Sequence, residues 1–165
     1  MTDHIDVYIG LGSNIGDRLS YLKRAALEIK ANSRHFLISS IYESVPVGYK
    51  CQPFYLNAVC KVETTKTPDQ MLFFLQTLEN KLGRTRSFAN APRKIDLDIL
   101  MWGDQVIRTP NLEVPHPRMI CRGFVMLPIV ELSPSVIHPV ERLTMAELLR
   151  KLRPSDMPRL VCESI

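Results

Sequence analysis

Apolar and polar residues recur along this chain with two different periods, which together predict a fold of strands and helices. Period-two alternation or a short apolar run, both typical of strands, occurs at residues 7–11, 36–45, 54–62 and 95–102. In the third of these segments Leu56, Ala58, Cys60 and Val62 share one face. We expect that face to be buried against helices.

Two segments between these strands have helical spacing and recognisable ends. The first runs from Asp17 to about Asn32, with its apolar residues on one face at intervals of three and four. The second begins at Thr67, a favourable N-cap followed by Pro68 at the first helical position, and runs to residue 82 before Gly83 ends it.

The C-terminal half is less regular. Gly103-Asp104 predicts a hairpin turn into a strand at residues 105–107. The proline-rich stretch 110–139 predicts loops around a short helix near 125–132, and Thr144 is expected to cap a last helix ending at Leu152. The order β-α-β-β-α-β with a C-terminal extension predicts one α+β domain over residues 1–165, a ferredoxin-like sandwich with a mainly antiparallel sheet.

Composition excludes several classes of protein. Apolar residues make up 45% and charged residues 23%, which is typical of a globular domain and excludes a disordered chain or a collagen. No apolar run approaches the roughly 20 residues of a membrane-spanning helix, and no signal peptide is visible. The four cysteines lack metal-ligand spacing. We expect free thiols in a cytoplasmic protein, monomeric by default.

The net charge of +4 is unevenly distributed. Residues 81–94 contain five cations and no carboxylate, and a second basic cluster follows further along the chain. The first group is Lys81, Arg84, Arg86, Arg93 and Lys94, and the second is His116, Arg118 and Arg122. Clustered cations favour an anionic ligand, although a solvated basic surface is the alternative interpretation.

The motif Asp96-Leu97-Asp98 carries the most specific chemistry. It lies inside an apolar strand, so both carboxylates project from one face while Leu97 points to the core. One alternative is an edge strand with a solvated acidic face. The other is a divalent cation, for which oxygen ligands suit Mg²⁺. The basic run with Arg84, Arg86 and Arg93 favours a site for a polyphosphate and its metal.

Other signals are weaker. Gly10-x-Gly12-x-x-x-Gly16 lacks the spacing of a dinucleotide-binding loop, and we interpret it as a tight turn. Tyr55 and Asn57 share a strand face, which suits a flat polar heterocycle but is also expected of two ordinary outward residues. His116, between two prolines, is either a loop residue or a phosphate donor.

These segments together resemble a known family. The signature lies in residues 90–100, Asn-Ala-Pro-Arg-Lys-Ile-Asp-Leu-Asp-Ile-Leu, which look like the 6-hydroxymethyl-7,8-dihydropterin pyrophosphokinases of folate synthesis. The resemblance continues, in order, through Gly12-Ser13-Asn14, residues 52–58, Gly83-Arg84-Thr85-Arg86, residues 114–118 and Arg122-Gly123-Phe124. It covers the chain from about residue 7 to residue 139.

The resemblance implies an activity and a set of ligands. This family transfers pyrophosphate from ATP to the pterin hydroxymethyl group and releases AMP. By resemblance, Asp96 and Asp98 hold two Mg²⁺ ions, and a mobile catalytic loop carries Arg84, Arg86 and Arg93. The expected partners are therefore ATP and the dihydropterin, with no nucleic acid and no membrane.

The resemblance also implies two sets of binding residues. Those expected at the nucleotide are Gln76, Glu79, Ile99, His116, Arg118 and Arg122, of which His116 and Arg122 are also expected to act on the phosphates in catalysis. Those expected at the pterin are Tyr55 and Phe124 as stacking faces, Asn57 at its polar edge, and the backbone near Ser44, Val45 and Val47. The chain departs from the usual pattern at Asn90-Ala91, where Trp-Gly is common, and at Ser44-Val45, where Thr-Pro is common.

Two other function classes fit part of the pattern. A metal-dependent nuclease also combines carboxylates with cations, but it predicts a wide basic face, whereas the cations here cluster in two short segments. A binding module without catalysis is the other class. The joint presence of Asp96, Asp98, Arg84, Arg93 and His116 favours an enzyme.

Overall fold

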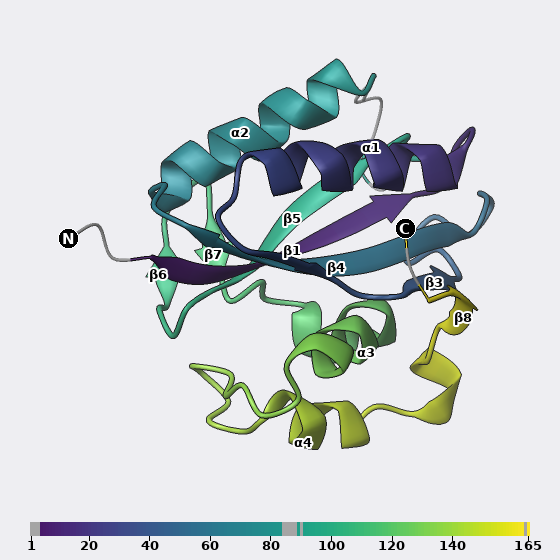
Figure 1. Ribbon diagram of the computed structural model, residues 1–165. Coiled ribbons are helices and arrows are strands. Elements are labelled where there is room, and N and C mark those ends of the chain that lie inside the picture. Colours follow the sequence, from purple (N-terminus) through teal and green to yellow (C-terminus); the bar gives the residue numbers. More distant parts are fainter. Residues whose placement is uncertain (1–3, 84–88, 90, 164) are drawn as a thin grey trace.

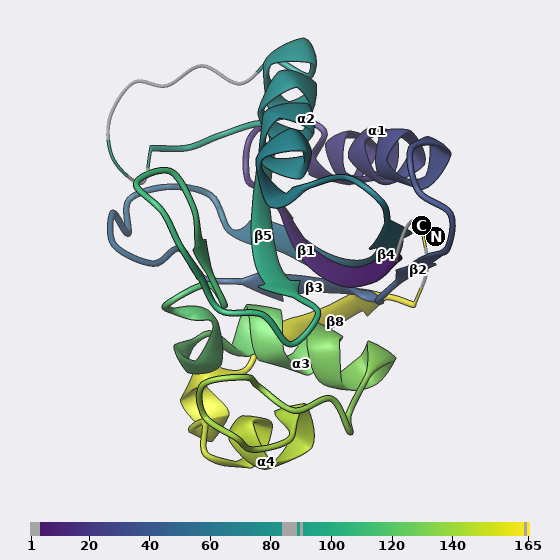
Figure 2. The ribbon, with the colours of Figure 1, turned by 90° about the vertical axis from the view of Figure 1, so that its left-hand side faces the viewer.

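An antiparallel sheet separates two helical layers in the computed structural model, which describes residues 4–83, 89, 91–163 and 165. Helices α1 (Arg18–Ala31) and α2 (Pro68–Lys81) lie on one face of the sheet, and α3 (Gly123–Leu132) and α4 (Met145–Arg150) lie on the other (Figures 1 and 2). No helix among the described residues is long and apolar enough to cross a membrane.

The main sheet has the strand order β5-β1-β4-β3-β8, with β2 also paired to β4, and every pairing is antiparallel. Its strands are β1 (Ile5–Ser13), β2 (Phe36–Ile38), β3 (Ile41–Ser44), β4 (Tyr55–Thr64), β5 (Asp96–Trp102) and β8 (Arg159–Cys162). A separate ribbon pairs β6 (Ile107–Arg108) with β7 (Glu113–Val114). The predicted mixed fold with a mainly antiparallel sheet is confirmed.

The predicted ends of the first two helices are also confirmed. The Asp17 side chain accepts a hydrogen bond from the Ser20 N–H at 3.1 Å. Thr67 and Gln70 form a reciprocal capping box at the start of α2, with Pro68 as its first residue. Gly83 follows α2 with a φ of 85°, a conformation that favours glycine.

The strand expected at residues 36–45 is instead divided into β2 and β3. At the break, the Ser39 N–H still donates to the Val59 carbonyl at 2.9 Å, but the Val59 N–H donates to the Ser39 hydroxyl, at 3.0 Å, and not to a backbone carbonyl. The Ser40 N–H and hydroxyl both donate to Glu131 of α3, at 2.9 and 2.8 Å. These side-chain bonds replace regular ladder bonds and interrupt the strand.

Two predictions for the C-terminal half need correction, and one strand there was not predicted. The Gly103-Asp104 turn closes only the bridge between Trp102 and Gln105, after which β6 pairs with β7 rather than with β5. The last helix ends at Arg150 rather than at residue 152. Strand β8 was not expected, because it is short and mostly exposed and has no alternating apolar pattern.

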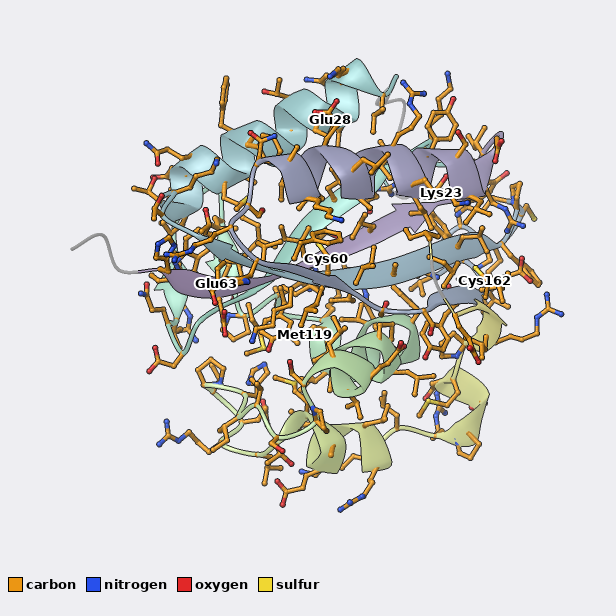
Figure 3. All side chains as sticks on the ribbon, in the orientation of Figure 1. Lys23, Glu28, Cys60, Glu63, Met119 and Cys162 are labelled. Carbon is orange, nitrogen blue, oxygen red and sulfur yellow. The ribbon has the colours of Figure 1, made fainter. Side chains whose placement is uncertain are left out.

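The sheet has an apolar core on each face. Figure 3 labels Cys60 in the core under α1 and α2, and Met119 in the core on the α3 and α4 side. The predicted inner face of β4 lies in the first core, as expected. On the opposite face of β4, Val59 belongs to the second core, and Asn57 is buried too. The functional site lies where this second cover ends.

Candidate functional site

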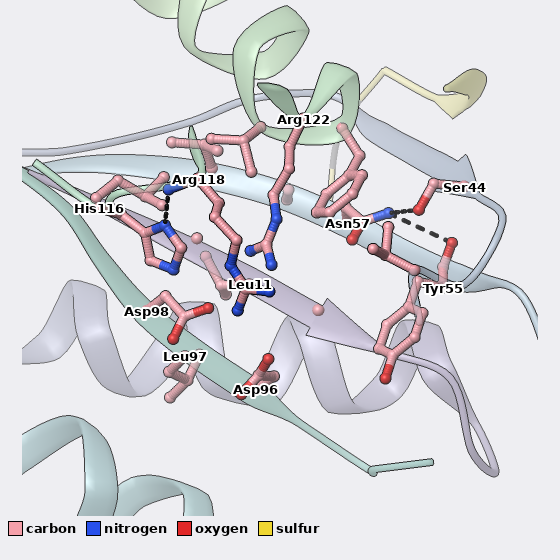
Figure 4. Close-up of a pocket in the computed structure, with 18 of the residues that line it drawn as sticks. Leu11, Ser44, Tyr55, Asn57, Asp96, Leu97, Asp98, His116, Arg118 and Arg122 are labelled. Carbon is pink, nitrogen blue, oxygen red and sulfur yellow. Dashed lines mark hydrogen bonds between the residues drawn. The ribbon is translucent and has the colours of Figure 1, made fainter. Parts of the chain in front are cut away.

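A cavity of about 300 Å³ opens over the uncovered end of the sheet (Figure 4). On this face, each of three adjacent strands changes along its length from core residues to site residues, because every second side chain of a strand lies on the same face. The series are Tyr8, Gly10 and Gly12 in β1, Val59, Asn57 and Tyr55 in β4, and Leu100, Asp98 and Asp96 in β5. Helix α2 and the start of α3 complete the walls.

Glycines form the floor beside the two carboxylates. Gly12 of β1 pairs with Asp96, and Gly10 pairs with Asp98. A Cβ at Gly12 would lie 3.6 Å from both the Asn57 Oδ1 and a Tyr55 ring carbon, inside the cavity. These two glycines are therefore part of a strand and keep the floor open, contrary to the tight turn predicted for them. Only Gly16 of this motif has a positive φ, at 69°.

The structure brings Asp96 and Asp98 together on the cavity side of β5, as their spacing predicted (Figure 4). Burial, together with the nearby charges of Asp96 and Glu79, raises the pKa of the Asp98 carboxyl to about 7. An Arg93 guanidinium nitrogen lies 3.1 Å from an Asp96 oxygen. The two carboxylates, Asp96 and Asp98, thus concentrate negative charge at one wall of the cavity, which favours a bound cation.

Two carboxylates are an incomplete metal site by themselves. Within the described part of the chain, no group of three or more His, Cys, Asp and Glu side chains could hold a metal ion. Mg²⁺ commonly binds through one or two carboxylates together with substrate phosphates and water. Asp96 and Asp98 fit that role, with further ligands coming from a phosphate-bearing substrate.

Helix α2 fixes the strand between these carboxylates. The side chain of Glu79 is buried, and its Oε1 accepts the Leu97 N–H at 2.7 Å. Gln76, one turn earlier, is exposed and lines the cavity together with Glu79. Ile99 differs from the other predicted nucleotide residues, because its side chain is buried in the core under α1 and α2.

Basic side chains reach the cavity from three further places in the chain. Arg93, Arg118 and Arg122 line it, and in Figure 4 the last two extend toward Asp98. His116 accepts the Arg118 N–H at its Nδ1 atom, at 3.1 Å, which leaves Nε2 to carry the proton of the neutral ring. Burial lowers the pKa of His116 to about 4, helped by Arg122 and Arg118. His116 is therefore a neutral hydrogen-bond donor.

The other end of the cavity is aromatic and amide-lined. Tyr55, Asn57, Phe124 and Ser44 all line it, as do the exposed side chains of Val45 and Val47. The Asn57 Nδ2 donates to the Ser44 hydroxyl at 2.8 Å, which orients the amide (Figure 4). The Phe124 ring has the Arg122 guanidinium 5.6 Å from its centroid, so the aromatic and basic parts of the cavity meet there.

Asn14 is a site-supporting residue for which the sequence predicted no role. It is buried, and its Oδ1 accepts the Arg93 N–H at 2.8 Å. Its Nδ2 donates to Gln52 Oε1 at 2.8 Å and to the Pro53 carbonyl at 3.1 Å. Asn14 therefore joins the backbone of Arg93 to the turn that precedes Tyr55. Its position after a strand was visible in the sequence, but its distant partners were not.

Two predicted catalytic residues, Arg84 and Arg86, lie outside the described residues, as does most of the loop expected to move. All other predicted site residues except Ile99 line the same cavity. One end of the cavity thus suits a polyphosphate with a cation, and the other suits a flat heterocycle.

Comparison with known proteins gives consistent matches. Residues 8–134 match the family model described as 7,8-dihydro-6-hydroxymethylpterin-pyrophosphokinase (HPPK). The chain is 42% identical over 156 residues to the 2-amino-4-hydroxy-6-hydroxymethyldihydropteridine pyrophosphokinase of Aquifex aeolicus, covering 94% of this chain and 95% of that protein. The enzyme of the same name from Bacillus subtilis is 44% identical over 131 residues, with 78% of each chain covered.

Some relatives are much longer. The folic acid synthesis protein fol1 of Pneumocystis carinii is 40% identical over 156 residues, which cover 94% of this chain but only 21% of that protein. A solved structure, Plasmodium falciparum HPPK-DHPS with pteroate, has a TM-score of 0.72 at 16% identity, covering 90% of this chain and 42% of that one. At that identity, the structural similarity shows the fold alone.

The geometry predicts that His116 stays neutral and protonated at Nε2. Nitrogen-15 NMR of the histidine rings is expected to show this tautomer, with a pKa of about 4, so that the ring remains uncharged from about pH 5 upward. The exposed His35 supplies an internal reference resonance. A His116 ring that gains its charge near pH 6.5, or carries its proton on Nδ1, would contradict this assignment.

The burial of Asp98 predicts a pH-dependent gain in stability for Asp98→Asn. The pKa of the Asp98 carboxyl is raised to about 7 in the folded protein, whereas in the unfolded chain it is about 3.9. The wild type therefore loses folding stability as the pH rises between these two values. The variant cannot ionise and avoids that loss. Its advantage in Tm should be smallest near pH 4, grow toward pH 7 and then level off. Asp104→Asn, at an exposed turn residue, is the charge-matched control, and an advantage independent of pH would refute the explanation.

Proposed function

This chain belongs to the 7,8-dihydro-6-hydroxymethylpterin-pyrophosphokinase family, enzymes of folate biosynthesis, and we propose that it transfers pyrophosphate from ATP to 6-hydroxymethyl-7,8-dihydropterin, releasing AMP. The protein is an enzyme of the pyrophosphokinase type. The observation that carries the finer proposal is the division of one cavity into a carboxylate and arginine end and an aromatic and amide end. Such a cavity suits a nucleotide polyphosphate facing a heterocycle.

In this proposal the nucleotide binds at the β5 and α2 end. Asp96 and Asp98 would hold Mg²⁺, two ions by family resemblance, which supplies charge neutralisation at the phosphate oxygens. Gln76 and Glu79 lie along the same side of the cavity. Arg93, Arg118 and Arg122 would bind the remaining phosphate oxygens, joined by Arg84 and Arg86 of the catalytic loop.

The dihydropterin binds at the other end. Tyr55 and Phe124 supply the faces on which its ring stacks, and Asn57 reads the polar edge through its amide. The backbone around Ser44, Val45 and Val47 closes the side of the pocket. The bond from Asn57 to Ser44 holds the amide in a single orientation, so its free hydrogen-bonding capacity is presented to the ligand in a fixed direction.

Catalysis is then mainly positioning and electrostatic stabilisation. The pterin hydroxyl oxygen forms a bond to the β-phosphorus of ATP and releases its proton to water, while the bond from that phosphorus to the oxygen of the departing AMP breaks. His116 donates Nε2–H to a phosphate oxygen without bringing a charge of its own. The arginines offset charge that develops on the transferred group and on AMP, and Arg93 is held for this by its contact with Asp96.

The proposal also includes the class of fold. The strands β3, β4, β1 and β5 lie side by side in an antiparallel sheet, with α1 crossing from β1 to β3 and α2 from β4 to β5. We interpret this as the ferredoxin-like arrangement expected from the sequence. A monomer in the cytoplasm remains part of the proposal.

An assay of the products tests the proposed reaction. With ATP, Mg²⁺ and the dihydropterin, the wild type should release AMP and no ADP. Asp96→Asn and Asp98→Asn should each lower turnover by at least about 100-fold, because each removes a carboxylate from the charged end of the site. Asp104→Asn is the control and should retain wild-type turnover. Release of ADP, or near-normal rates in either site variant at saturating Mg²⁺, would contradict the proposal.

The aromatic end predicts a selective loss of pterin binding. Tyr55→Ala and Phe124→Ala should each remove a stacking face worth about 0.5–1.5 kcal/mol beyond the area it buries. Affinity for a non-hydrolysable ATP analogue should change far less. Phe73→Ala, which removes an exposed aromatic ring from α2, is the matched control. Calorimetry that found equal losses for both ligands would indicate collapse of the site rather than lost stacking.

A further inference from the structure

The C-terminal segment 154–162, called here the strap, has no part in the mechanism above and lies beyond residues 8–134, which match the family. It consists of a short 3₁₀ turn, Pro154–Asp156, followed by β8. We infer that the strap positions the aromatic half of the site by joining the start of α3 to the end of β3. This inference rests on the proposed function, since it concerns the pterin pocket.

The first attachment is at Gly123, the first residue of α3. The strap backbone comes so close that a Cβ built at Gly123 would overlap the Asp156 carbonyl oxygen and carbon and lie 3.2 Å from the Met157 Cα. Glycine is required here by space, because the obstructing atoms belong to the backbone and cannot rotate away. Gly123 lies between Arg122 and Phe124, which both line the cavity. The strap therefore sets where the helix start, and with it the Phe124 ring, can sit.

The strap is held in shape at this attachment. Arg153 donates to both Asp156 carboxylate oxygens, from Nε at 3.0 Å and from Nη2 at 3.1 Å. The Asp156 N–H donates to the Arg153 carbonyl at 2.9 Å, which closes the turn. This fork fixes the residue whose carbonyl rests against Gly123.

The second attachment is at β3, on the Tyr55 side of the pocket. Strand β8 pairs with β3, whose last residue is Ser44 (Figure 1). Arg159 of the strap lies 2.7 Å from one oxygen of Glu43, and Arg18 lies 2.9 Å from the other. Arg18 also donates to the Phe54 carbonyl, at 2.8 Å, next to Tyr55.

These contacts connect the two stacking faces through the strap. Phe124 is tied to it by Gly123, and Tyr55 is tied to it by Glu43 and Arg18. A flat ring held between two aromatic faces requires a constant separation between them, and a supporting layer provides that separation. In contrast, Asp96 and Gln76 come from β5 and α2, on the opposite side of the cavity. A disturbed strap should therefore weaken pterin binding more than nucleotide binding.

The test is a double-mutant cycle on pterin affinity. Gly123→Ala should weaken binding of 6-hydroxymethyl-7,8-dihydropterin at least tenfold, measured in the presence of a non-hydrolysable ATP analogue. In the Phe124→Ala background the same change should cost less than twofold, because the ring through which the strap acts is gone. Affinity for the ATP analogue alone should fall less than threefold.

A milder variant covers the case in which Gly123→Ala does not fold. Arg153→Ala removes an exposed side chain and frees Asp156, so it should weaken pterin binding two- to fivefold, again only when Phe124 is present. Arg150→Ala, which removes an exposed arginine from the neighbouring α4, is the matched control and should bind as the wild type does.

The outcomes separate the two claims. If the wild type does not bind the dihydropterin, the proposed function is wrong, and this inference fails with it. If the wild type binds but the strap variants lose nothing, or lose the same factor with and without Phe124, the strap has no positioning role and the proposed function stands.

Discussion

The site depends on two like charges held close together on one strand at the edge of the sheet. Asp96 and Asp98 share a face of β5, and burial raises the pKa of Asp98 to about 7. Such a pair is costly unless cations offset it. The protein supplies part of the compensation through Arg93 and Arg122, and Glu79 fixes the strand between the two carboxylates. In the proposed function, a cation that arrives with its phosphate ligand would offset this charge further.

The order of the strands places the carboxylate pair at one end of a cavity and the aromatic residues at the other. Because β1 lies between β4 and β5, its glycines Gly10 and Gly12 form an open floor between the carboxylates on one side and Tyr55 and Asn57 on the other. The helices of the second core cover the same face further along the strands, so the cavity has a defined edge. The strap outside the family match then supports the aromatic edge.

The sequence predicted those features that depend on local spacing. Both carboxylates were placed on one face from the strand period, and the ends of α1 and α2 followed from Asp17, Thr67 and Gly83. Features that depend on distant partners could not be predicted. The break at Ser39 and Ser40 depends on Val59 and Glu131, and the requirement for glycine at Gly123 depends on Asp156. The role of Gly10 and Gly12 as the floor of the cavity depends on the strands that pair with β1. Ile99 lies in the core, although the resemblance implied a place at the nucleotide.

The central claim is that the carboxylate pair is half of a cation site, which the nucleotide completes. Electron paramagnetic resonance of Mn²⁺ bound to the protein, with and without a non-hydrolysable ATP analogue, tests this directly. We expect weak binding of Mn²⁺ alone, at least tenfold tighter binding with the analogue present, and loss of that gain in Asp96→Asn. Equally tight binding of Mn²⁺ without nucleotide, or an unchanged gain in Asp96→Asn, would contradict the account.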